Sequence, residues 1–76
     1  MTAEHFDLSL RGMQRRTPFK SFVVELVSGE HITVDHPEAV VIRAGLAVFI
    51  DARGIPTWFD HESVSQLIGE GERASA

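Results

Sequence analysis

Two short segments carry the residue types that acid–base, metal or nucleophilic chemistry would need. In the first, His36-Pro37-Glu38, a histidine close to a carboxylate could bind a metal or move protons. No second histidine lies within ligand spacing of His36, because the other three are spread over different parts of the chain. We therefore interpret residues 36–38 as a bend, in which the proline ends a strand and His36 or Glu38 caps exposed backbone.

The second segment, Asp60-His61-Glu62-Ser63, contains the letters of a hydrolase triad. Triad side chains must converge, whereas neighbours within one turn mostly point apart. We expect this segment to be a single helical turn capped by Asp60, without a catalytic role. The chain has no cysteine, which excludes a thiolate zinc site and a thiol nucleophile. The protein is therefore predicted to be non-enzymatic, with no catalytic residue, no cofactor and no metal site.

A helix over residues 3–15 is predicted to begin after Thr2, whose hydroxyl can accept a hydrogen bond from a free backbone N–H of the first turn. Phe6, Leu10 and Met13 fall on one narrow stripe at helical spacing. Because a single apolar stripe must pack against something, the helix is expected to dock on the rest of the domain.

From Lys20 onward the apolar residues alternate with the period of a β-strand. The first two strands are expected to form a hairpin, with Gly29 at positive φ in its turn. The third and fourth strands are apolar on both faces, so they need cover on both sides. Strands are predicted at residues 20–28, 31–36, 39–43, 46–52 and 64–68, with extended structure resuming at 57–59.

The predicted fold is mainly β, with one N-terminal helix. Five short strands in 76 residues cannot stay an open flat sheet with both faces filled, so we expect a strongly bent, five-stranded small barrel. Residues 1–69 form this single domain. Residues 70–76 contain glycine, charged and small side chains and are predicted to be a disordered tail.

Charge is spread unevenly along the chain. The net charge is −4, but residues 1–20 carry +2 and residues 21–76 carry −6. A nucleic-acid-binding protein normally shows a basic field over one face, since phosphate contacts supply most of its affinity. We interpret the basic residues as a solvated helix face followed by a basic linker. The alternative is a small anion-binding rim.

Residues 22–29, a strand followed by a glycine turn, are similar to the first motif of the Sm-like family. These are the small SH3-like barrels of the Sm and LSm proteins and of the bacterial RNA chaperone Hfq. Residues 58–65 resemble the Tyr-Lys-His-Ala segment before the last strand of Hfq, with Phe59, Asp60 and His61 in place of the first three. The resemblance covers nearly the whole chain and implies an Sm-like barrel that contacts RNA. An aspartate in place of the lysine would repel phosphate, so RNA is disfavoured by this route.

A second resemblance carries no activity with it. Residues 18–22, Pro-Phe-Lys-Ser-Phe, are followed by Gly29 and by the His-Pro-Glu of 36–38. This pattern is similar to a group of small bacterial proteins that share a Pro-Phe-x-x-Phe start, a glycine turn and a His-Pro-Glu segment.

Trp58 and Phe59 are adjacent, so in a strand they must face opposite sides, one toward the core and the other toward a partner. A domain this small without disulfides often gains stability from oligomerisation. We expect a homo-oligomeric ring of about five to seven copies, by analogy with the Sm-like fold, in which the fourth strand of one copy pairs with the last strand of the next. The predicted subunit interface consists of Leu46, Val48, Phe49, Ile50, Val64, Leu67 and Ile68.

The predicted function is that of a self-associating scaffold or protein-interaction module in the cytoplasm. The longest apolar runs, such as 46–50, are too short to span a bilayer, so no contact with a membrane is expected. The alternative function is that of an Hfq-like RNA-binding regulator. Its RNA or partner contacts would be Arg11, Arg15, Arg16, Lys20, Phe59 and His61.

Overall fold

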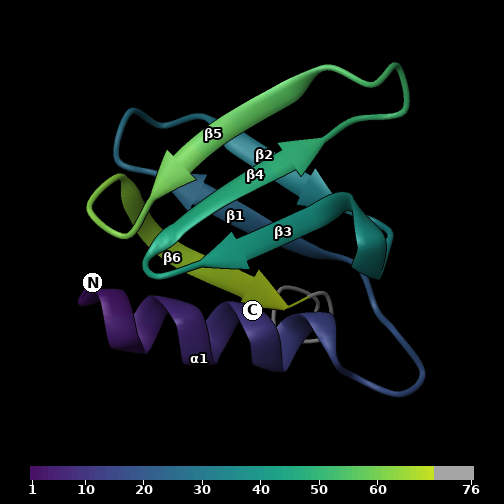
Figure 1. Ribbon diagram of the computed structural model, residues 1–76, viewed down its shortest axis with the longest axis horizontal. Helices are drawn as coiled ribbons and strands as arrows, with labels where there is room; N and C mark the ends of the chain where they lie inside the picture. The colour runs from purple at the N-terminus through teal and green to yellow at the C-terminus, as the bar shows by residue number, and fades with distance from the viewer. Residues whose placement is uncertain (70–76) are drawn as a thin grey trace.

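The computed structural model describes residues 1–69, which contain one α-helix, a short 3-10 helix and six strands (Figure 1). The predicted tail over residues 70–76 lies outside the described residues. In chain order the elements are α1 (Ala3–Gln14), β1 (Phe22–Leu26), β2 (His31–Val34), η1 (Pro37–Ala39), β3 (Val40–Arg43), β4 (Leu46–Ile50), β5 (Pro56–Asp60) and β6 (Val64–Gly69).

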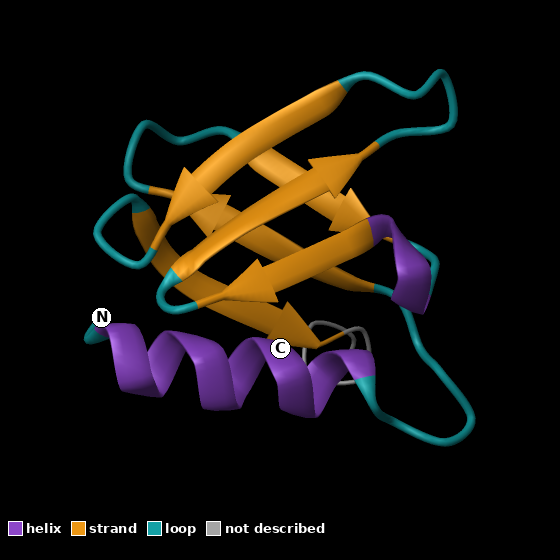
Figure 2. Cartoon of the chain, in the orientation of Figure 1, coloured by secondary structure: helices purple, strands orange, loops and turns teal. Residues whose placement is uncertain are grey.

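The strands form two antiparallel three-stranded sheets, with the orders β2-β1-β6 and β3-β4-β5. The two sheets form two layers, and α1 runs along β3 and β6 (Figures 1 and 2). The fold is thus mainly β with an N-terminal helix, as predicted. The prediction of a closed five-stranded barrel is wrong in both its strand number and its closure.

Local backbone chemistry explains both differences. Pro37 opens η1 and separates β2 from β3, so the chain passes from one sheet to the other there. Asp51 accepts hydrogen bonds from the N–H groups of Arg53 and Ile55 at 2.8 and 3.0 Å, which fixes the loop before β5. Residues 57–59, for which only extended structure was predicted, therefore belong to a complete strand, β5, that pairs with β4 along its length.

The core lies between the sheets and α1. Phe6, Leu10 and Val24 are fully buried, and the ring of Phe6 packs edge-to-face on that of Phe59 with centroids 6.0 Å apart. Phe22 is also buried, whereas Phe19 and Phe49 are partly buried against the same cluster. The remaining buried members are Ile32, Val34, Val40, Ile42, Ala47 and Val64.

The structure confirms the predicted N-terminal helix. Thr2 is the N-cap, and its Oγ1 accepts from the N–H of His5 at 3.1 Å. Phe6 and Leu10 face the core with Met13 beside them, while Leu8, on the opposite side, is 67% exposed. The helix ends one residue earlier than predicted, at Gln14.

Gly29 adopts φ +94 in the β1–β2 turn, as predicted. Gly45, which has φ +81, lies where three segments meet. Its N–H donates to Asp7 Oδ1 at 2.8 Å and its carbonyl accepts from the N–H of His61 at 2.9 Å. An added Cβ at Gly45 would lie 2.8 Å from Cβ of Ala3. The N-terminus of α1 and the β5–β6 turn thus close around this glycine.

Polar groups of α1 cover the outer edge of β3. Gln14 Nε2 donates to the carbonyls of Pro37 and Val40 at 2.7 and 2.8 Å, and Arg11 Nη2 donates to the carbonyl of Ile42 at 3.0 Å. An uncovered strand edge is a template for pairing with another chain. The helix side chains replace a neighbouring strand at this edge.

The edge of β5 is short of backbone donors and acceptors. Pro56 has no N–H, and at the other end the N–H of Asp60 donates to Ser63 Oγ while its carbonyl accepts from the N–H of Ser63, both at 3.1 Å. The predicted edge-to-edge pairing of the fourth strand is wrong, because β4 is the central strand of its sheet, hydrogen-bonded to β3 and β5.

Candidate functional site

The chain bends at His36, as predicted, and Pro37 and Glu38 then belong to the 3-10 helix η1. Pro37 lies at the start of η1, and His36 precedes it in extended conformation without a side-chain capping bond, so the predicted cap by that residue is not formed. The segment borders a cleft of about 470 Å³ that Asp35, Phe49 and Asp51 also line. Within residues 1–69, no group of three or more histidine and acidic side chains is placed to hold a metal ion.

Residues 60–63 form a hydrogen-bonded turn between β5 and β6; the prediction of a helical turn is wrong. Asp60 Oδ1 accepts from the N–H groups of Glu62 and Ser63 and from the Ser63 hydroxyl, at 3.0–3.1 Å, so Asp60 caps the turn as expected. The Ser63 hydroxyl and N–H lower the pKa of Asp60. His61 turns away, with Nδ1 2.9 Å from the Met1 carbonyl oxygen.

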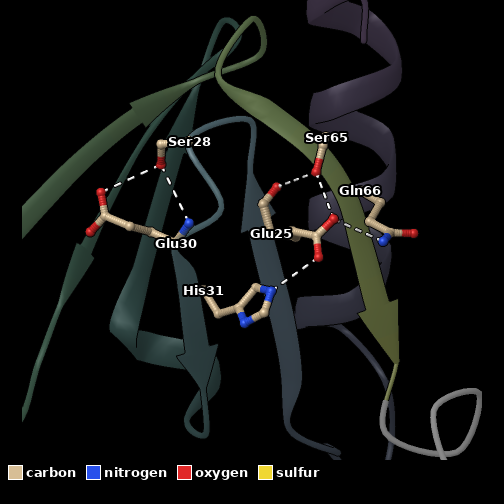
Figure 3. Close-up of polar contacts among 6 residues, drawn as sticks. All are labelled: Glu25, Ser28, Glu30, His31, Ser65 and Gln66. Carbon is tan, nitrogen blue, oxygen red and sulfur yellow. Dashed lines mark hydrogen bonds and ion pairs between the residues drawn. The ribbon is translucent and has the colours of Figure 1, made fainter.

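A polar cluster that the sequence analysis missed lies on the outer face of the β2-β1-β6 sheet (Figure 3). Glu25 on β1 accepts hydrogen bonds from Ser65 Oγ and Gln66 Nε2 on β6, both at 2.9 Å. Its second oxygen lies 3.0 Å from His31 Nε2 on β2. These bonds, with His31 as the largest contributor, lower the pKa of the Glu25 carboxyl.

The order of groups in this cluster rules out a serine hydrolase arrangement. In a triad the histidine lies between the serine and the acid, so that it can take the serine proton. Here the carboxylate of Glu25 lies between Ser65 and His31. The cluster joins three strands through one carboxylate. Its register could be read from the sequence, since the turn at Gly29 places His31 opposite Glu25.

The structure does not gather the residues predicted to contact RNA. Arg15, Arg16 and Lys20 follow the C-terminal end of α1, whereas His61 contacts Met1 at its other end. A helix of 12 residues separates the two groups by about 18 Å. Arg11 is engaged by the Ile42 carbonyl, and Phe59, at 4% exposed, is a core residue and cannot stack on a base.

The outer face of the β3-β4-β5 sheet is apolar and exposed. Val41 on β3, Val48 on β4 and Trp58 on β5 form one row of directly paired residues across the sheet. Val41 is 57% exposed and Trp58 66% exposed. Leu46 and Ile50 flank the row along β4 and are also exposed. We call these five residues the Trp58 face.

The Trp58 face contains three of the seven residues predicted for a subunit interface, namely Leu46, Val48 and Ile50. The strand was predicted to be apolar on both sides. The structure explains this pattern, because Ala47 and Phe49 face the core while Leu46, Val48 and Ile50 face outward. The other predicted interface residues lie elsewhere: Val64 is 2% exposed and belongs to the core, and Leu67 packs against it, while Ile68 is half-buried opposite Val23.

Trp58 and Phe59 take opposite sides of β5, as predicted, with Phe59 inside and Trp58 outside. A large exposed aromatic that continues an apolar face is typical of a protein interface, where tryptophan is enriched. The Trp58 face is therefore the candidate functional site.

No family model, no curated protein and no solved structure matches the chain. Within residues 1–69, the helix is too short and too polar to cross a membrane.

Proposed function

We propose that the protein is a non-enzymatic, self-associating scaffold or protein-interaction module, and that the Trp58 face is the surface through which one copy binds another. The observation that carries the proposal is the row of Val41, Val48 and Trp58 across the exposed side of a three-stranded sheet. Monomeric proteins rarely leave such contiguous apolar surface in water. A location in the cytoplasm stays a prediction.

A second copy is the occupant that the face itself favours. Arg43 and Asp60 lie at opposite edges of the sheet, in the row formed by their common neighbour Leu46. The face therefore carries one charge of each sign beside its apolar centre. A surface of this kind can be complementary to itself. This arrangement replaces the edge pairing expected from the sequence.

The relation to the Sm-like fold and the Hfq-like function are alternative proposals. The order of one helix followed by short strands supports the first. Two of the predicted RNA contacts do not join the basic residues at the C-terminal end of α1, since His61 lies at the other end of the helix and Phe59 is buried.

Trp58 is the single tryptophan of the chain, so its fluorescence reports on the proposed interface. Light scattering over a hundredfold dilution series should show a mass that falls toward one subunit. The tryptophan emission should shift to longer wavelength over the same range, as the indole becomes solvated. Addition of single-stranded RNA should leave both curves unchanged.

Trp58→Thr should abolish self-association while leaving the far-ultraviolet circular dichroism and the melting temperature in dilute solution nearly unchanged. Leu8→Gln is the matched control, because Leu8 is as exposed as Trp58, 67% against 66%, but lies on α1 away from the core. The control should associate like the unaltered protein. A protein that has the mass of one subunit at every concentration would refute the proposal, and a mass increase only with RNA would favour the alternative.

A further inference from the structure

Around the Trp58 face, the residues on β3 and those on β5 differ in a complementary way on the two sides of β4. One row reads Arg43, Leu46 and Asp60 across β3, β4 and β5. The next row on the same side reads Val41, Val48 and Trp58. In both rows the residue on β3 is complementary to the residue on β5, in charge in the first and in size in the second.

We infer that two copies pack face to face around a two-fold axis that lies in the interface and runs along β4, an inference that rests on the proposed function. Such an axis places β3 of each copy over β5 of the other. Arg43 of one copy then meets Asp60 of the other, and each such contact occurs twice. The small Val41 meets the large Trp58, while Val48 and Leu46 meet their own counterparts near the axis.

The state of Asp60 supports this pairing. Its carboxylate is held by the turn through Oδ1, and the hydrogen bonds from Ser63 and Glu62 favour the ionised form. A fixed negative charge at one corner of an apolar face needs a cation opposite it when the face is covered, because an unpaired charge is costly to remove from water. Arg43 is the cation that the two-fold axis supplies.

A two-fold axis that runs across the strands fails this requirement. It would place the row of Arg43 and Asp60 over the row that contains Ile50 and Pro56, on the far side of Val48. Asp60 would then lie over Pro56 without a cation, and Arg43 would lie beyond the start of β3. The orientation along β4 pairs both charges, so electrostatic complementarity selects it.

The assembly inferred here is a closed dimer. Because the contact is made by the same face on both subunits, a third copy has no equivalent surface left to bind. The ring expected from the sequence needs two different surfaces on each copy, whereas the Trp58 face is one surface that is used by both.

Single thiols distinguish the two axes, because the chain contains no cysteine. Facing sheets lie about 10 Å apart, too far for a disulfide between residues directly opposite. A short bismaleimide that bridges two thiols is therefore the probe. Val48→Cys and Leu46→Cys place the thiol over β4, Val41→Cys places it on β3, and Leu8→Cys is the control on α1.

Val48→Cys and Leu46→Cys should cross-link to dimers about tenfold or more faster than Val41→Cys, since only thiols over the axis are held opposite their counterparts. Leu8→Cys should react no faster than colliding monomers. Light scattering on the same samples separates this inference from the proposed function. Equal or faster cross-linking of Val41→Cys in a sample that self-associates would overturn the β4 axis alone, and a mass of one subunit would overturn both.

Discussion

At the scale of single residues, Gly45 shows how tightly the turns and the helix meet. An alanine there would be unfavourable for two reasons. The backbone has φ +81, which strains a residue with a side chain, and the added Cβ would lie 2.8 Å from Ala3 Cβ and 3.0 Å from His61 Cδ2. We expect Gly45→Ala to lower the free energy of unfolding by about 2–4 kcal/mol. Urea denaturation followed by circular dichroism measures this loss.

Gly54→Ala is the matched control, because Gly54 also has φ +81 but nothing lies within 4 Å of an added Cβ. It should cost roughly 1 kcal/mol, the backbone contribution alone. Equal losses for the two variants would show that Ala3 and His61 do not close around Gly45.

Glu25 gives the chain a predictable response to acid. Its folded pKa is lowered below the ordinary value of 4.5, first by the hydrogen bond from His31 and then by those from Gln66 and Ser65. A carboxyl whose folded pKa is below its unfolded pKa stabilises the fold above the unfolded value. That contribution is lost as the pH falls through the folded pKa.

The difference in unfolding free energy between the unaltered protein and Glu25→Gln should therefore shrink in acid, beginning below about pH 4.5. Denaturation midpoints measured from pH 7 down to pH 3 test it. Glu30→Gln is the control, since Glu30 is an exposed neighbour on the same hairpin. A difference that does not change with pH would contradict the role assigned to the carboxylate.

At the scale of elements, α1 is held to β3 by side chains as well as by its apolar stripe. Gln14 satisfies two carbonyl groups in a partly buried place. Gln14→Ala should cost about 1–2 kcal/mol, because those acceptors lose their donor. Thermal or urea unfolding measures the change, and Leu8→Ala on the exposed side of the helix should stay within about 0.5 kcal/mol. Equal effects of the two would mean that Gln14 is not holding the edge.

Local patterns in the sequence predicted the helix, the hairpin and the bend. The stripe of Phe6, Leu10 and Met13 and the cap at Thr2 each depend on neighbours a few positions away. Whether the sheets close into a barrel depends on contacts between distant parts of the chain. Nothing local shows that Gln14 will reach the carbonyls of residues 37 and 40, so the helix as a cover for β3 was not predictable.

The candidate site was predictable in part for the same reason. Alternation showed that Trp58 and Phe59 face opposite sides and that residues 46–50 are apolar on both. Alternation does not show which strand lies at the centre of a sheet, because this depends on strand pairing. In the structure, β4 pairs with β3 on one side and with β5 on the other. The row of Val41, Val48 and Trp58 exists only once this pairing is known.

At the scale of the whole molecule, the pairing of charges across the dimer can be tested by reversing one of them. Arg43→Glu places like charges together at two places in each dimer. We expect its dissociation constant to rise by about tenfold or more, which corresponds to about 1.4 kcal/mol. Sedimentation equilibrium at several concentrations measures this constant.

Lys20→Glu changes the net charge by the same amount at an exposed position outside the Trp58 face. It should leave the dissociation constant of the dimer nearly unaltered. A comparable weakening by both variants would assign the effect to net charge, and an unaltered constant for Arg43→Glu would remove Arg43 from the interface.

The covering of β3 by a helix has a consequence for how the chain would misfold. When α1 detaches, the carbonyls of Val40 and Ile42 lose Gln14 and Arg11, and an open edge appears beside the uncharged run 46–50. Exposed edges next to uncharged segments of high β-propensity are where fibrils start. We therefore expect the helix to protect this edge from fibril formation, so a truncation that removes α1 should form fibrous aggregates that thioflavin T fluorescence detects.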